Sequence, residues 1–258
     1  MSGGGATTPA TRAEVCVAAL AETFRGDGEV VANPIGTVPV IAGRLARATF
    51  EPALLVADAP ALIEGTPPVG DPDAGKTVAA WIPFRKMFDV VWSGRRHVIM
   101  GASQIDAYGN QNFALIGDPA KPKAQLLGFR GAPGNTINHK TSYWIPGHSP
   151  RSFVEKVDVV TGLGYDRAAA LGPAGRFHRL GLVVTDLAVL DFDTPEHRMR
   201  LRSVHPWSSV DDVVAATGFE LVIDGDVPTT AEPGAEALRL IREVIDPQGL
   251  RDREVPPS

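Results

Sequence analysis

The sequence predicts an α/β protein with an open, mainly parallel sheet that is flanked by helices and extended by a smaller antiparallel part. Helical and strand-like segments alternate in the first part of the chain, which is typical of a parallel sheet with crossover helices. Strand-like segments dominate the second half. No repeat or linker interrupts residues 11–258, so we predict one domain behind a disordered tail at residues 1–10.

The first part of the chain contains the alternating segments. Thr11 and Glu14 form a capping-box pattern that predicts a helix ending near Gly26. Residues 64–76 are rich in Gly, Pro and Asp and predict a surface loop. Around this loop we expect, in order, a strand at 29–32, a helix at 35–48, a buried strand at 54–57, one or two helical turns at 84–92, and a strand at 96–100.

For the rest of the chain, from residue 101 onwards, the sequence predicts loops, strands and two helices. Residues 101–112 predict a polar loop with a turn at Gly109, and residues 128–150 predict an irregular region. Ser208 predicts the cap of a helix that ends at Gly218, and a last helix is expected at 236–245. Strands are expected at 154–160, 181–185, 188–192, 198–204 and 219–223.

Composition excludes several classes of function. The 258 residues carry a net charge of −5, which gives no broad attraction to nucleic acid or to anionic lipid. No apolar run reaches the roughly 20 residues of a membrane helix, and the N-terminus lacks the pattern of a secretion signal. The single cysteine, Cys16, allows no internal disulfide and fits a helical core position. We therefore expect a cytoplasmic protein.

Residues 70–77 match the letters of a phosphate-binding P-loop but lack its physical requirements. Pro72 has no N–H to donate, and Asp71 and Asp73 would repel phosphate. The preceding residues make a poor strand, and Pro83 leaves no room for a long helix. We interpret this segment as an acidic surface loop.

No nucleophile elbow, C-x-x-C or H-E-x-x-H pattern is present, and no two of the six histidines have zinc-like spacing. We expect no metal site. His139 and His148 stand out only because they lie in the glycine-rich region 128–150.

Two polar segments remain as candidate ligand sites. Gln104 and its polar neighbours follow a predicted strand end, where ligands collect in α/β sheets; the alternative is a loop that binds its own backbone. Gly131 and Gly134 would let backbone N–H groups approach a ligand closely, as binding of an oxyanion requires; the alternative is an ordinary glycine turn.

Four segments of the second half of the chain belong together. They are Gly101-Ala-Ser-Gln104-Ile-Asp106-Ala-Tyr-Gly109-Asn110, Gly131-Ala-Pro-Gly134-Asn135, Arg151-Ser-Phe-Val-Glu155-Lys156-Val-Asp158, and Val184 to Phe192 followed by His205-Pro206. In this order they resemble the beta subunits of class I CoA-transferases such as glutaconate CoA-transferase. This resemblance implies a CoA-transferase fold, an acyl-CoA substrate and an alpha-subunit partner in a heterodimer or heterotetramer, with coenzyme A bound only as part of the substrate.

The sequence departs from the family at the expected nucleophile. The resemblance places a glutamate just after an apolar strand, where it would attack the thioester. Here Leu54-Leu-Val-Ala is followed by Asp58, and a shortfall near 1 Å can cost about a hundredfold in rate. Pro133 also removes an N–H from the glycine loop.

These departures resemble a subgroup of the family, the beta subunits of actinobacterial hydrolases that open a steroid-derived ring in cholesterol catabolism. Residues 131–144 and 250–254 carry this likeness. It implies hydrolysis of a carbon–carbon bond in a cyclic diketone CoA thioester by a glutamate of the alpha subunit. This chain would supply substrate contacts, with Asp58 only a weak catalytic candidate. The contacts would come from Gln104, Gly131, Gly134, Asn135, Asn138, His139, Tyr143 and Trp144.

Two further readings stay open. The chain could belong to a true CoA-transferase in which Asp58, or a displaced Glu51 or Glu64, is the nucleophile. It could also be a non-catalytic partner that only stabilises the alpha chain. For Tyr143 and Trp144, core packing is the alternative to contact with an alicyclic ring.

Overall fold

The computed structural model describes residues 8–58, 61–71 and 77–256. Its centre is one nine-stranded sheet in the order β13-β12-β11-β10-β5-β1-β2-β3-β4. The five middle strands are parallel: β11 (Arg179–Thr185), β10 (Lys140–Ile145), β5 (Arg96–Met100), β1 (Val31–Pro34) and β2 (Leu55–Asp58). The predicted α/β class and mainly parallel sheet are confirmed.

Antiparallel strands extend the sheet at both edges. One edge adds β12 (Ala188–Asp191) and β13 (Arg200–Val204), and the other adds β3 (Ala61–Glu64) and β4 (Thr77–Trp81). Two small hairpins lie outside the sheet: β6 (Gln104–Ile105) with β7 (Gln111–Asn112), and β8 (Leu115–Asp118) with β9 (Lys121–Gln125).

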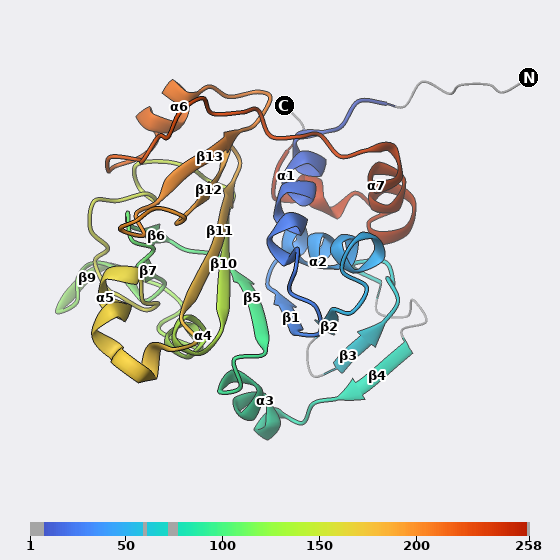
Figure 1. Cartoon of the computed structure of the whole chain (residues 1–258), viewed down its shortest axis with the longest axis horizontal. Coiled ribbons are helices and arrows are strands. Elements are labelled where there is room, and N and C mark those ends of the chain that lie inside the picture. Colours follow the sequence, from blue (N-terminus) through green and yellow to red (C-terminus); the bar gives the residue numbers. More distant parts are fainter. Residues whose placement is uncertain (1–7, 59–60, 72–76, 257–258) are drawn as a thin grey trace, which may run out of the picture.

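Helices from both ends of the chain pack together on one side of the sheet (Figure 1). They are α1 (Arg12–Ala21), α2 (Thr37–Thr49), and α7 (Ala235–Arg239) with the π-helical turn Leu240–Ile245 that continues it. The capping box of Thr11 and Glu14 is present, as predicted. Buried Glu14 also forms ion pairs with Arg242 and Arg251, which connect α1 to the C-terminal part of the chain.

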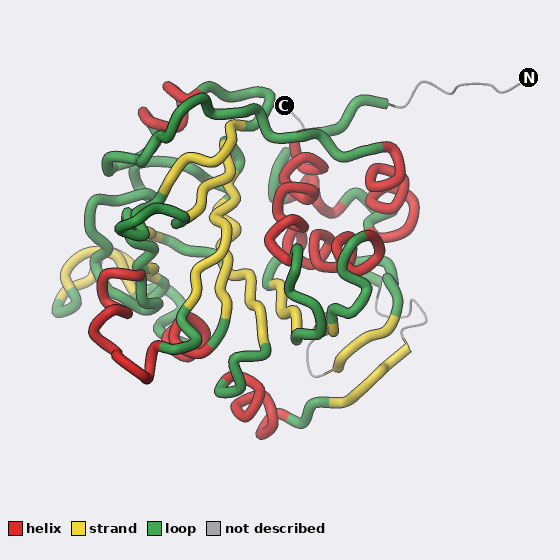
Figure 2. Tube along the Cα trace, in the orientation of Figure 1, coloured by secondary structure: helices red, strands yellow, loops and turns green. Residues whose placement is uncertain are grey.

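Alternate residues of the central strands face two separate cores. Ile99, Trp144 and Val184 point towards α1 and α2. Val98 and Tyr143 point to the opposite face, which is covered by α4 (Ala132–Asn138) and the loops around α5 (Tyr165–Ala168) and α6 (Val210–Ala215). Figure 2 shows the strands running through the middle of the molecule between these groups of helices. Every side chain of β5 and all but the first of β10 are buried, as the middle of a parallel sheet requires.

The structure differs from three sequence predictions. The region 128–150 is irregular only at its two ends, because Pro133 stands in the first turn of α4 and the apolar run that follows forms β10. The strands expected at 154–160 and 219–223 do not form; Val154 and Val157 belong to irregular backbone, and Val222 makes only an isolated bridge. The helix α6 is capped by Ser209 rather than Ser208.

One helix lies apart from both cores. The predicted turns at 84–92 form α3 (Phe84–Val91), which contains no buried residue and follows the fully exposed edge strand β4. In Figure 1, α3 lies at the bottom of the molecule, between β4 and β5. No helix within the described ranges is long and apolar enough to cross a membrane. The domain boundary at residue 11 stays a prediction, since residues 1–7 lie outside the described residues.

Candidate functional site

The polar loop after β5 binds itself rather than leaving groups free. Gln104 Oε1 accepts from Asn112 Nδ2 at 2.7 Å and from the N–H of Asp158 at 3.0 Å. Its amide nitrogen donates to the Asp158 carboxylate at 3.0 Å. Gln104 is also buried. The loop therefore follows the self-bonded alternative, and a substrate contact by Gln104 stays a prediction.

The second half of this loop is organised around Asp106. Its Oδ1 accepts from the N–H groups of Tyr108 and Asn110, both at 3.0 Å, and its Oδ2 accepts from Asn110 Nδ2 at 3.0 Å. Asn110 Oδ1 in turn accepts from Gly164 N–H at 2.8 Å. A Cβ on Gly164 would lie 2.5 Å from the Asn110 nitrogen, so this contact requires glycine. The motif builds a rigid scaffold.

A different polar cluster lies where β5 begins. Arg96 is 6% exposed, and its Nη1 donates to Asn135 Oδ1 at 2.6 Å and to His139 Nε2 at 3.1 Å. Its Nη2 donates to Asn33 of the neighbouring strand β1. The Nε–H has no hydrogen-bond partner in the ranges 8–58, 61–71 and 77–256. These four residues, which we call the Arg96 cluster, join β1, β5 and α4 on one face of the sheet.

The charge of Arg96 has no counter-charge among the described residues. Among the residues that the structure describes, no carboxylate lies within ion-pair distance of its guanidinium. Burial alone lowers the pKa of Arg96 to about 10. Its neighbour in sequence, His97, points to the opposite face and does have an acid, because Asp27 bonds its Nδ1 at 2.5 Å. A buried cation without an anion is costly, so Arg96 is the outstanding electrostatic feature of the molecule.

His139 serves the cluster as a neutral acceptor. Burial, followed by the charge of Arg96, lowers the pKa of His139 to about 4. The ring is therefore uncharged near neutral pH, with Nε2 free of a proton to accept from Arg96 and Nδ1 donating to the Lys140 carbonyl at 3.3 Å.

Helix α4 brings the predicted residues Asn135 and His139 to Arg96, but it uses the others differently. Gly131 is the exposed cap residue of the helix. Gly134 faces α3, where an added Cβ would lie 3.3 Å from Val91. Asn138 Nδ2 bonds the Gly134 carbonyl at 2.9 Å. Oxyanion binding by the glycines and substrate contact by Asn138 stay predictions.

The two predicted aromatic residues lie in the two cores. Tyr143 is fully buried, and its hydroxyl has no partner in the described part of the chain. Trp144 packs towards α2, and its Nε1 donates to Glu254 Oε2 at 2.8 Å. Glu254 also accepts from the first N–H groups of α2. These positions favour the core-packing alternative for both residues.

The predicted nucleophile position is the last residue of β2. The backbone of Asp58 is described there, but its side chain lies outside the described residues, as does most of the P-loop-like segment. No group of three potential metal ligands is found in the part of the chain that the structure covers.

The sequence reasoning missed Arg96 and Asn33. A signal was present, because Arg96 and His97 open a segment that was predicted to be a strand of the parallel sheet. Charged side chains at a buried strand need partners or a ligand. Asn33 carried no comparable signal, since one asparagine in a short strand is unremarkable in sequence.

Comparison with known proteins agrees with the resemblance seen in the sequence. A model of the coenzyme A transferase family matches residues 84–216. The chain also superimposes on the crystal structure of glutaconate coenzyme A-transferase from Acidaminococcus fermentans with a TM-score of 0.79 and 28% identity, covering 93% of this chain and 96% of that one. The chain belongs to the coenzyme A transferase family.

Within this family, the chain is most usefully compared with ring-cleaving hydrolases. It is 53% identical over 249 residues to the cholesterol ring-cleaving hydrolase IpdB subunit of Rhodococcus jostii (strain RHA1), covering 96% of this chain and 97% of the relative. Identity to the subunit of the same name from Mycobacterium tuberculosis is 47% over 246 residues, with 95% and 98% covered. The crystal structure of Rhodococcus jostii RHA1 IpdAB matches with a TM-score of 0.91 and 51% identity, over 96% of this chain and 99% of that one.

Proposed function

We propose that this chain is the beta-type subunit of a cytoplasmic two-subunit hydrolase that opens a steroid-derived ring carried as a CoA thioester. Identity of 53% over nearly the full length of a ring-cleaving hydrolase subunit supports this reaction class. The buried, reduced Cys16 supports the location. The proposal requires coenzyme A only as part of the substrate.

One observation carries the proposal at the level of the site: Arg96 is buried and has no anion within the described chain. Such a residue is suited to bind a negatively charged group of a ligand. Ring cleavage of a diketone produces such groups. Attack of water on one ring carbonyl creates an oxyanion, and cleavage of the neighbouring carbon–carbon bond leaves an enolate. Arg96, fixed in place by Asn33 and Asn135, would bind an oxygen that gains charge in this sequence.

In this proposal the base belongs to the alpha-type partner. The described part of the chain places no carboxylate beside Arg96, and the family nucleophile position holds Asp58. The partner's glutamate would take the proton from water, while this chain orients and stabilises the anion. The division of labour follows from the chemistry that each subunit can offer.

The test replaces Arg96 by Met in the assembled two-subunit enzyme. We expect kcat/KM for hydrolysis of a cyclic diketone CoA thioester to fall by about 10²–10³-fold, because a buried charge-assisted contact is lost. The isolated Arg96→Met chain should be at least as stable as the wild type, since an uncompensated buried charge is removed. Arg239→Met, on the exposed surface of α7, is the matched control and should change neither quantity.

Other results would point elsewhere. Full turnover by an assembled Arg96→Met enzyme would indicate that the chain is only a structural partner. A borohydride-reduced residue on this chain after incubation with acyl-CoA would indicate a CoA-transferase with a nucleophile on this subunit.

A further inference from the structure

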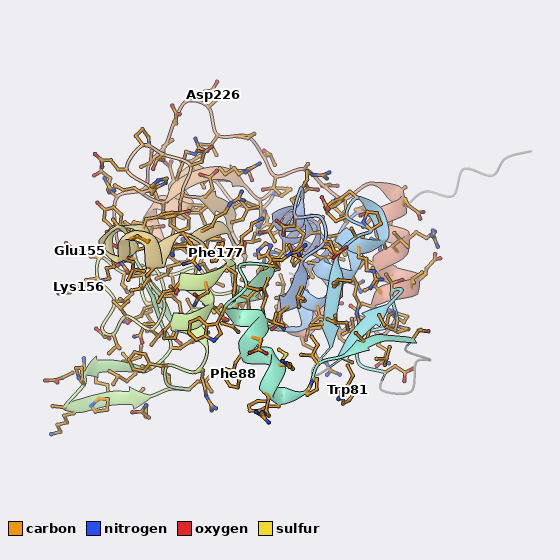
Figure 3. The ribbon with its side chains drawn as sticks, turned by 60° about the horizontal axis from the view of Figure 1, so that its bottom comes forward. Trp81, Phe88, Glu155, Lys156, Phe177 and Asp226 are labelled. Carbon is orange, nitrogen blue, oxygen red and sulfur yellow. The ribbon has the colours of Figure 1, made fainter. Side chains whose placement is uncertain are left out.

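Helix α3 carries a stripe of exposed aromatic side chains. Phe84, Phe88 and Trp92 are spaced four residues apart, so they lie on one helical face, and they are 78%, 54% and 62% exposed. The rings of Phe84 and Phe88 meet edge to face with centroids 5.5 Å apart. Trp81, at the end of the edge strand β4, is 64% exposed and precedes the stripe. Figure 3 shows Trp81 and Phe88 at the surface of this end of the molecule.

Other residues of α3 anchor the helix and leave the aromatic stripe outside. Met87 packs against the small cluster that contains Ile82, and Val91 lies against Gly134 of α4. Four aromatic side chains left outside expose apolar surface on the order of 500 Å². Apolar patches of this size on a single chain are often functional, and a stable interface covers about 800 Å² of each partner.

The rim of the stripe is positively charged although the chain is acidic overall. Exposed Arg85 and Arg95 form no ion pair with any residue that the structure describes, whereas Lys86 is neutralised by Asp89. The net charge of the chain is −5. The Arg96 cluster adds another uncompensated cation four residues after the stripe ends, and Val91 of α3 lies against Gly134, next to Asn135.

We propose that the aromatic stripe of α3, with Trp81, is the surface on which the alpha-type subunit docks. This rests on the proposed two-subunit enzyme. The proposal requires a matching face on the alpha-type chain that is apolar and has carboxylates at its rim to pair with Arg85 and Arg95. Docking there seats the partner beside the Arg96 cluster, so the face that completes the active site is the face that holds the assembly together.

The rim charges argue against a second copy of this chain as the occupant. A two-fold symmetric contact through the stripe sets the same patch on both chains, so Arg85 and Arg95 face their own copies or each other. Like charges at such a contact are destabilising. An acidic partner removes this conflict.

The test is the double substitution Phe84→Ser/Phe88→Ser, measured by binding to the purified alpha-type chain without substrate. Both side chains are exposed in this chain, so its thermal unfolding should stay unchanged, while the Kd for the alpha-type chain should rise at least about 100-fold. Val214→Ser is the matched control, since Val214 is an exposed apolar residue of α6 at the opposite end of the molecule (Figure 1), and its Kd should equal that of the wild type.

The charge at the rim is tested with Arg85→Glu/Arg95→Glu. This variant should associate more slowly, by about tenfold or more at low salt, and the difference should shrink as salt is added. An unchanged Kd for the double serine variant overturns the proposal. So does a stripe-dependent dimer of this chain alone, or stripe-dependent binding to anionic lipid vesicles, with the alpha-type Kd unaffected.

Assembly and chemistry are measured separately here. If the stripe variants lose the partner but the wild-type complex opens no ring, the docking surface stands and the proposed reaction fails. If the wild-type complex is active and the stripe variants assemble normally, the reaction stands and the docking surface fails.

Discussion

Two buried polar regions of this chain look alike in composition and differ in charge balance. The loop around Gln104 and Asp106 and the Arg96 cluster both gather amides and charges in few residues. In the loop, the carboxylate of Asp106 is met by two backbone N–H groups and one side-chain amide. In the Arg96 cluster, the guanidinium donates to neutral acceptors, and its Nε–H is unpaired as far as the described residues show.

The difference separates scaffold from site. A polar network that satisfies itself rigidifies the fold and has nothing left for a ligand. A buried charge that the chain does not balance costs stability and is retained where an outside group balances it. The loop carries the more recognisable family motif, yet the Arg96 cluster is the better candidate for chemistry.

The largest effect on stability is therefore expected in the loop. Asp106→Ala leaves the N–H groups of Tyr108 and Asn110 and the Asn110 amide without their acceptor. We expect the free energy of unfolding to fall by about 3–5 kcal/mol, measured by urea denaturation of the isolated chain.

Asp106→Asn is the matched control. It keeps one oxygen for the two backbone donors, so its loss should be smaller, about 1–2 kcal/mol. If Asp106→Ala has the same urea midpoint of unfolding as the wild type, the loop is not the self-satisfied scaffold that distinguishes it from the Arg96 cluster.

The sequence was sufficient to predict the fold because its signals are local. The capping box of Thr11 and Glu14 and the strand at 96–100 depend on nearest neighbours in the chain, and both were found where expected. The region 128–150 was misread because its glycines and prolines suggested a loop, while Pro133 in fact starts a helix. Burial against β5 and β11 then selects the strand β10, and that pairing is invisible in a single segment.

The candidate site was predicted only in part for a similar reason. Asn135 and His139 were chosen from the glycine-rich segment, and the structure brings both to Arg96. Asn33 reaches the same place from a strand more than sixty residues earlier in the chain, through sheet register alone. The resemblance suggests Trp144 as a ring contact, with core packing as the alternative; sheet register turns its side chain towards Glu254, which favours that alternative.

An effect of intermediate size on the pH dependence of stability is expected from His139. Its titration tests whether the Arg96 cluster contains only neutral acceptors. The unfolded histidine takes up a proton near pH 6.5, whereas the buried one, with a pKa of about 4, does not. The folded state therefore loses stability as pH falls from about 6.5 towards 4, where the unfolded state binds the extra proton.

Replacing His139 by Gln should make that loss smaller by about 2 kcal/mol between pH 7 and pH 5, measured by urea denaturation at both values. Gln keeps an oxygen that can accept from Arg96. The ring protons of His139 in an NMR titration give the pKa directly. A midpoint near 6.5 in the folded chain would mean that the ring is not the neutral acceptor of a buried cation.

The smallest effect is expected at Tyr143. This residue tests whether a neutral buried group without a partner marks a functional site, as we propose for the charged group of Arg96. Its hydroxyl is buried without a partner in the described chain, but it is neutral, so removing it costs no interaction. Tyr143→Phe should leave the free energy of unfolding unchanged or raise it by up to about 1 kcal/mol, with the same KM for the ring substrate.

Tyr165→Phe is the matched control, and its free energy of unfolding should fall by about 1 kcal/mol. The Tyr165 hydroxyl donates to the Leu180 carbonyl and accepts from the Leu180 N–H, both at 3.1 Å. A raised KM for Tyr143→Phe at unchanged stability would mean that the hydroxyl bonds the substrate, and neutral orphaned groups would then join Arg96 as markers of this site.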